Sequence, residues 1–144
     1  MAGAGGIFRT SRGFPRGAFS FGISSSFAYE AELKAAIFAI KMAWSKGWHN
    51  LWLECDFIYI VKLFLSRSRH VSWEIQADWF QCLHLAAQMN LKVSHIYCEG
   101  NSVADLLSKY GLTMSSLSWW DSIPNFCHVN VCNDFNRVPN FRFH

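Results

Sequence analysis

The 144-residue sequence has few charged side chains, and its carboxylates are unevenly distributed. Charged residues make up 16% of the chain, against about a quarter in a typical soluble domain. Hydrophobic residues reach 51%, which excludes a disordered, solvating tail. No Asp or Glu precedes Glu30, so the first part of the chain supplies no carboxylate to any site. The length fits a single domain with its own core.

Long apolar runs and an export signal are also absent. The densest apolar stretch, Ile58 to Leu65, is short and is interrupted by Lys62, so we expect no membrane span. The N-terminus lacks the basic-then-apolar order of a secretory signal. The cysteines are odd in number and lie in apolar surroundings, which favours buried reduced thiols in an intracellular, reducing compartment, with nucleus and cytoplasm both open. They are Cys55, Cys82, Cys98, Cys127 and Cys132.

The hydrophobic pattern predicts eight elements in the order β-β-α-β-α-α-β-α. Four segments are typical of strands, and the first two are joined by a turn-rich link that predicts an antiparallel hairpin. The predicted strands are Gly3–Arg9, Gly17–Ser25, Leu51–Asp56 and Leu91–Tyr97, and the predicted helices are Ala31–Trp44, Ile58–Ser66, Glu74–Met89 and a last one capped by Asn101 that stops at Gly111. This order favours an α/β fold with a mixed central sheet flanked by helices. Residues 1–111 form the predicted domain, and 112–144 an irregular C-terminal tail.

Three carboxylates occupy positions that backbone geometry directs to one place. Glu32 lies in the first turn of its predicted helix, Asp56 ends a strand, and Asp105 lies about one turn into the last helix. Strand C-termini and helix N-termini share one edge of such a sheet. Three carboxylates there would repel one another unless a hard divalent cation were present, and Mg²⁺ or Mn²⁺ on such oxygens organises phosphoryl transfer. Taken singly, the same residues also fit a helix-dipole contact, a turn and a solvated helix position.

Four segments, taken in order, resemble the ribonuclease H fold. They are Gly5–Arg9 (GGIFR), Ala31–Ala35 (AELKA), Glu54–Asp56 (ECD) and His95–Leu107 (HIYCEGNSVADLL). More specifically, they resemble plant ribonuclease H-like domains related to the C-terminal part of non-LTR retrotransposon reverse transcriptases. The resemblance covers about residues 3–111. Two later segments, Trp119–Pro124 and Pro139–Phe143, are similar to the tail that often follows this domain.

The resemblance implies metal-dependent, endonucleolytic hydrolysis of RNA in RNA–DNA hybrids, with two Mg²⁺ or Mn²⁺ ions. Glu32, Asp56 and Asp105 match the metal-binding carboxylates of the family. His95 matches a histidine that assists product release or proton transfer, and a purely structural role is the alternative. Asn101 matches an asparagine of the nucleic-acid site, and a simple helix cap is the alternative.

The first hairpin is basic and offers a second point of contact with nucleic acid. Arg9, Arg12 and Arg16 lie in a stretch with no acid before Glu30. Because phosphate contacts supply much of the affinity for nucleic acids, we expect these arginines to face a phosphate backbone. A solvated turn is the alternative interpretation of the same residues.

The sequence departs from the family at its start. The resemblance implies a first strand with an Asp-Gly pair upstream of Gly5–Arg9, and its aspartate would bridge both metals. That strand would be central, in the order 3-2-1-4-5, so we expect a gap beside the Asp56 strand that another segment or chain fills. His128–Cys132 in the tail is one candidate. The isolated chain is expected to have little or no activity, and a non-catalytic nucleic-acid-binding module or a degenerate retroelement fragment remain alternatives.

Overall fold

A mixed sheet forms the centre of the protein, with its strands in the order β4-β3-β6-β1-β2-β5. The computed structural model describes residues 2–24, 27–68, 70–97, 102–113, 116–122, 124–127 and 141–143. The strands are β1 (Ala2–Thr10), β2 (Pro15–Ile23), β3 (Asn50–Cys55), β4 (Asn90–His95), β5 (Ser118–Trp120) and β6 (Phe141–Phe143), and the helices are α1 (Ala28–Ser45), α2 (Ile58–Ser66), α3 (Trp73–Ala87), α4 (Ser102–Gly111) and the short 3₁₀ helix η2 (Asn125–Cys127). The predicted order of the first eight elements is confirmed.

The hairpin and the parallel pair of strands follow from local sequence. β1 pairs antiparallel with β2, and the turn between them is closed by the Gly13 amide, which donates to the Thr10 carbonyl at 2.8 Å. Gly13 adopts φ 88°, a left-handed conformation that glycine reaches at little cost. β3 pairs parallel with β4 in continuous register from Asn50 opposite Asn90 to Cys55 opposite His95. The C-terminal ends of both parallel strands therefore meet at one edge of the sheet.

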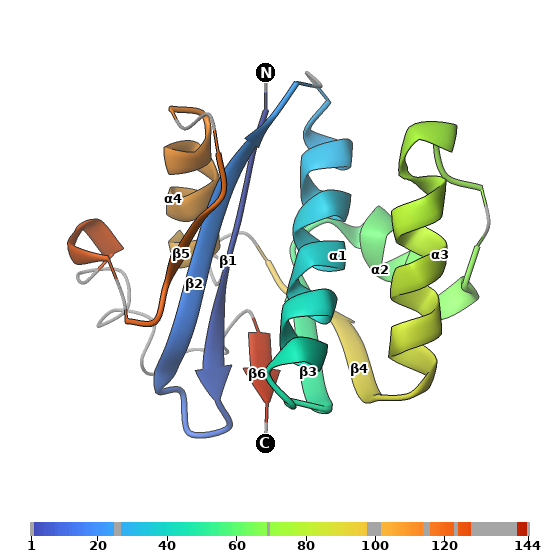
Figure 1. The fold of residues 1–144 in the computed structure, drawn as a ribbon, viewed down its shortest axis with the longest axis horizontal. Helices are drawn as coiled ribbons and strands as arrows, with labels where there is room; N and C mark the ends of the chain where they lie inside the picture. The colour runs from blue at the N-terminus through green and yellow to red at the C-terminus, as the bar shows by residue number, and fades with distance from the viewer. Residues whose placement is uncertain are drawn as a thin grey trace.

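Helices cover both faces of the β1–β2 hairpin. Successive side chains of β1 point to alternate faces of the sheet. Phe8 packs in a core cluster that includes Leu33 and Ile40 of α1, whereas Ile7 packs with Leu107 of α4 in a second cluster. The helices α1 and α4 therefore lie on opposite sides of the hairpin, as Figure 1 shows.

Glycine in β1 permits α4 to approach closely. A Cβ built on Gly5 would lie 2.5 Å from the backbone carbon of Leu107, closer than real Cβ atoms come. The hydroxyl of Ser20 in β2 donates to the Leu107 carbonyl at 2.5 Å. These contacts fix α4 against the sheet, and with it the first turn that carries Asp105.

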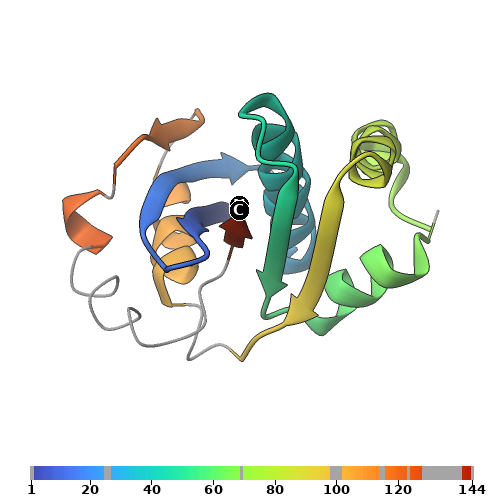
Figure 2. The same cartoon turned by 90° about the horizontal axis from the view of Figure 1, so that it is seen from below.

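The segment Phe141–Phe143 lies between β1 and β3, as Figure 2 shows from below. It pairs parallel with Arg9 and Thr10 of β1 and antiparallel with Leu51–Leu53 of β3. A tail segment thus occupies part of the central gap that the resemblance implies. The suggested filler, His128–Cys132, lies outside the described residues.

Two segments of the tail that was expected to be irregular form short strands. Ser118–Trp120 pairs with β2 at one edge of the sheet, and Phe141–Phe143 pairs at its centre. Both strands have three residues, which is too short for a hydrophobic period. They form because neighbouring strands offer backbone donors and acceptors that need partners.

Two further expectations are tested by the fold. Cys55, Cys82 and Cys127 are buried and free, which confirms buried thiols at these three positions, whereas Cys98 and Cys132 lie outside the described residues. No helix in the described part of the chain has both the length and the apolar character that crossing a bilayer requires.

Candidate active site

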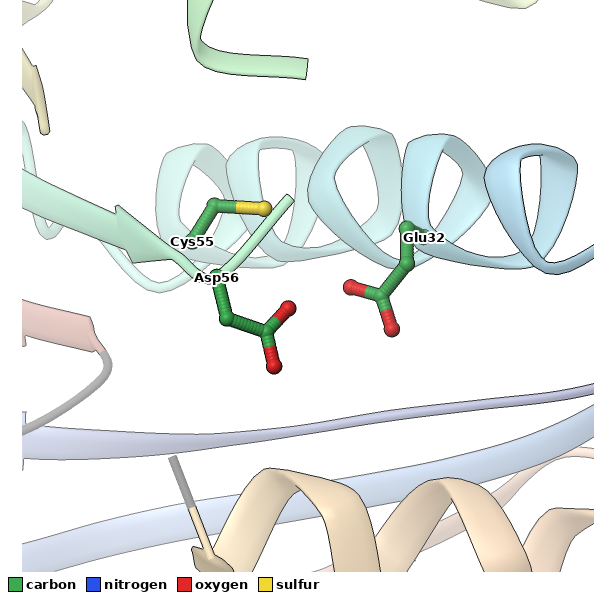
Figure 3. Close-up of side chains that lie close together, drawn as sticks. All are labelled: Glu32, Cys55 and Asp56. Carbon is green, nitrogen blue, oxygen red and sulfur yellow. The ribbon is translucent and has the colours of Figure 1, made fainter. Parts of the chain in front are cut away.

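The fold brings Glu32 and Asp56 together from two elements. Glu32 lies on α1, and Asp56 directly follows β3. Their carboxylate oxygens and the sulfur of Cys55 all lie within 4.8 Å of one another. Figure 3 shows the two carboxyl groups pointing toward one another, with the thiol of Cys55 beside them. Because β3 ends beside the N-terminal half of α1, the residue after the strand faces the second turn of the helix.

The charge of Asp105 also acts on Glu32. The pKa of Glu32 is raised from its ordinary value of 4.5 to about 7, first by burial and then by the negative charges of Asp56 and Asp105. Burial disfavours a charged carboxylate, and a neighbouring charge of the same sign disfavours it further. Asp105 on α4 therefore lies near enough to act on Glu32 electrostatically, whereas the ligand atoms within 4.8 Å of one another belong to Glu32, Cys55 and Asp56.

Asp105 is the most exposed of the three carboxylates. Its Oδ2 lies 2.9 Å from Nζ of Lys109, one turn later on α4, and the Asp105 side chain is 55% exposed. Such a surface ion pair contributes little to stability. Replacing the Lys109 ammonium group beside Asp105 with another cation would therefore cost little free energy.

Cys55 is a member of the cluster that the sequence did not single out. The side chain is 6% exposed, and its Sγ donates to the Phe57 carbonyl at 3.8 Å. The pKa of the Cys55 thiol is raised to about 12, chiefly by burial and also by the charges of Glu32 and Asp56, while a backbone hydrogen bond with Phe57 partly offsets the rise. The sequence pattern that could have identified Cys55 is the alternation of Leu51, Leu53 and Cys55 along β3, because it places all three side chains on the side of the sheet that α1 covers.

His95 lies beside Asp56 and contacts its backbone. Nε2 of His95 is 3.1 Å from the Asp56 carbonyl oxygen, so the bond requires the tautomer in which Nε2 carries the proton. The ring packs edge-on against Tyr97 with centroids 5.4 Å apart. His95 thus holds the turn that presents Asp56, while its role in proton transfer or product release stays a prediction.

The predicted nucleic-acid contacts fall into three groups. Arg12 and Arg16 are exposed at the hairpin turn, as the prediction requires. Arg9 is 1% exposed, which corrects the expectation that it faces a phosphate backbone. β1 continues to Thr10, so Arg9 belongs to the strand and its side chain is covered. Asn101 lies outside the described residues.

A small cavity links the elements of the site. Glu32, Cys55 and Ala104 all line it, together with Gly5 and Leu53 among others, and about 20 Å³ is open to the centre of a water-sized sphere. That volume is enough for about one water molecule. Ala104 directly precedes Asp105, so the cavity joins α1 and β3 to the helix that carries the third carboxylate.

The residues present fit a hard divalent cation. Glu32, Asp56 and Asp105 supply oxygen donors, which are the ligands that Mg²⁺ and Mn²⁺ prefer. The pKa of Glu32 is raised chiefly by burial and further by the charges of Asp56 and Asp105, and a bound cation would offset that negative charge. The cluster is therefore a candidate metal centre.

Comparison with known proteins places these residues in a family context. A family profile described as reverse transcriptase-like matches residues 1–111. An Arabidopsis thaliana protein, named a putative ribonuclease H protein, is 30% identical over 125 residues, which cover 80% of this chain and 18% of that protein. The chain thus corresponds to a small part of that relative's length.

Solved structures with a similar fold include two proteins. Ribonuclease H1 of the halophilic archaeon Halobacterium salinarum superposes with a TM-score of 0.68 at 18% identity, covering 77% of this chain and 85% of that one. The protease–reverse transcriptase of prototype foamy virus gives a TM-score of 0.56 at 15% identity, covering 79% of this chain and 20% of that one. At these identities the similarity concerns the fold.

Proposed function

Since the chain belongs to the reverse transcriptase-like family and has the ribonuclease H-like fold, we propose that it binds RNA–DNA hybrids at the carboxylate cluster. The chemistry of this site is hydrolysis of the RNA strand. The observation that carries the proposal is the close approach of the Glu32 and Asp56 carboxylates, with Asp105 near enough to contribute to the raised pKa of Glu32.

Each residue of the site has a distinct role in this proposal. Glu32, Asp56 and Asp105 would hold Mg²⁺ or Mn²⁺. When bound, such an ion supplies activation of a water molecule and stabilisation of the leaving oxygen. To hold the cation, Glu32 would give up its proton and Asp105 would release the ammonium group of Lys109. His95 positions the backbone of Asp56. The 2′-hydroxyl groups in the wide minor groove distinguish the RNA strand from DNA.

The 144-residue chain by itself is proposed to have little or no hydrolytic activity. Two observations support this part of the proposal. No carboxylate precedes Glu30 in the sequence, so the hairpin provides no fourth acidic ligand. In addition, β6 takes up part of the space between β1 and β3, where the resemblance implies a strand with an aspartate.

A non-catalytic nucleic-acid-binding module is the second candidate function. The exposed Arg12 and Arg16 at the hairpin turn favour it, because they present positive charge away from the carboxylate cluster. Phosphate contacts of this kind give affinity without requiring a metal ion. Binding in a chelator separates this candidate from the first.

The test measures binding and cleavage of a labelled RNA–DNA hybrid by the 144-residue chain. Four proteins are compared: the parent chain, Asp56→Asn, the double variant Arg12→Ala/Arg16→Ala, and Lys62→Ala, which removes one exposed positive charge from α2. Cleavage is followed with Mg²⁺ and with Mn²⁺, and binding is followed with a chelator.

Three outcomes are informative. Binding in the chelator without cleavage, weakened in the double arginine variant but not in Asp56→Asn or Lys62→Ala, favours the non-catalytic module over binding at the carboxylate cluster. Metal-dependent cleavage that Asp56→Asn abolishes supports the carboxylate site and overturns the expectation of inactivity. A folded chain that neither binds nor cleaves the hybrid would contradict both candidate functions.

A further inference from the structure

The site contains a soft donor beside its hard ones. Sγ of Cys55 belongs to the same group of ligand atoms as the oxygens of Glu32 and Asp56, with every separation within 4.8 Å. The thiol also lines the small cavity that Glu32 lines. Cys55 is therefore not a remote buried thiol but part of the wall of the candidate metal centre.

The spacing of these three atoms is close to what one ion requires. Zinc lies about 2.3 Å from a cysteine sulfur and about 2.0–2.2 Å from a carboxylate oxygen. In a tetrahedral zinc site a sulfur and an oxygen bound to the same ion are therefore about 3.6 Å apart. The donor atoms of this cluster lie within 4.8 Å of one another, so movements of about 1 Å by the Glu32 and Asp56 side chains would bring them to that spacing.

The two donor types favour different cations. Mg²⁺ takes oxygen ligands and would use Glu32 and Asp56 without the sulfur. Zn²⁺ and Cd²⁺ accept thiolate together with carboxylate, and thiolate selects such soft or borderline ions. The same cluster thus offers two overlapping sets of ligands, which share the two carboxylates.

We propose that Cys55, Glu32 and Asp56 form a binding site for thiophilic divalent cations, and that Zn²⁺ or Cd²⁺ bound there excludes Mg²⁺. When the metal–sulfur bond forms, the thiol proton leaves to solvent, and both electrons of the bond come from sulfur. The inference deepens the proposed function, and its inhibitory part rests on that function because exclusion concerns the Mg²⁺ of the same site.

The experiment titrates the 144-residue chain with Cd²⁺ and follows the ultraviolet charge-transfer absorption of the cadmium–thiolate bond. Cys55→Ser is compared with Cys82→Ser, which removes another buried thiol from the same hydrophobic core. We expect Cys55→Ser to lose one equivalent of the tightest Cd²⁺ binding, whereas Cys82→Ser retains it. Circular dichroism checks that both variants fold.

A second variant keeps the test decisive if Cys55→Ser does not fold. Glu32→Gln retains the thiol but removes one carboxylate ligand, and we expect it to weaken Cd²⁺ binding by about tenfold or more. Equal Cd²⁺ binding by the parent chain and by folded Cys55→Ser or Glu32→Gln would overturn the proposal.

A competition with Mg²⁺ separates this inference from the proposed function. Mg²⁺ should weaken Cd²⁺ binding in the parent chain if both cations use Glu32 and Asp56. Cd²⁺ binding that depends on Cys55, in a chain that does not bind Mg²⁺, would support the thiophilic site and contradict the Mg²⁺ site. Independent binding of both cations would overturn the claim of exclusion.

Discussion

Replacing Glu32 with Gln is expected to stabilise the chain at neutral and alkaline pH in the absence of divalent cations. The pKa of Glu32 is raised from 4.5 to about 7, so the folded protein holds this proton more tightly than the unfolded chain does. Between these two values the folded state binds more protons, and stability falls as the pH rises. The shift corresponds to about 3 kcal/mol of unfolding free energy.

The stability that protonated Glu32 contributes is present below pH 4.5 and is lost as the pH rises through about 7. Glutamine does not titrate, so the variant does not undergo this loss. The free energy of unfolding of Glu32→Gln, minus that of the parent chain, should therefore increase by up to about 3 kcal/mol between about pH 4.5 and pH 8.

Urea unfolding with a chelator present, followed by tryptophan fluorescence at several pH values, measures this difference. Glu74→Gln is the matched control, because it removes an exposed carboxylate from the first turn of α3. Its difference from the parent chain should change much less over this range. A difference for Glu32→Gln that stays constant with pH would refute the argument that burial and the neighbouring carboxylates destabilise the charged form.

The remaining predictions concern packing, charge and the central strand. Gly5→Ala should destabilise the chain by about 1–3 kcal/mol or more in urea unfolding, because its Cβ would collide with the α4 backbone; an unchanged midpoint would contradict the close approach. Asp105→Asn should lower the pKa of Glu32, so that the NMR signal of its side-chain carboxyl carbon titrates at a lower pH than in the parent chain. An unchanged titration midpoint would show that Asp105 does not act on Glu32. The double variant Arg12→Ala/Arg16→Ala should reduce the slope of log binding constant against log salt by up to about 2, and an unchanged slope would mean that these arginines do not contact phosphate. Deleting residues 141–144 should speed amide hydrogen exchange within Leu51–Leu53, whereas unchanged protection would show that β6 contributes no pairing there.

The order of the main elements was predictable because it depends on local periodicity. The spacing of Leu33, Ile37 and Ile40 determines the face that α1 buries, and short apolar runs between turn residues predict the paired strands. β5 and β6 were missed because three-residue strands have no detectable period. Their formation depends on partners that lie far away along the chain.

The proximity of Glu32 and Asp56 was predictable, but the energetics of the site were not. Strand ends and helix starts share one edge of such a sheet, and the structure brings these two carboxylates together there, while the role of Asp105 stays a prediction. The raised pKa of Glu32 depends on burial, which requires the packed fold. Arg9 was expected at the surface because it is charged, and the sequence does not show that its position on β1 is covered. Cys55 was overlooked because a cysteine in an apolar strand resembles any core residue.

The position of β6 has a consequence for folding during synthesis. This strand joins β1 to β3, yet it follows the other elements along the chain. The hairpin and the β3–β4 pair emerge from the ribosome first and can form early. The facing edges of β1 and β3 can pair with β6 only after Phe143 has been added. Contacts between such distant segments close slowly, since a long loop must first be ordered. Until then, backbone edges at the centre of the sheet stay available to other extended chains, so the nascent protein is expected to be most prone to aggregation before Phe143 is added.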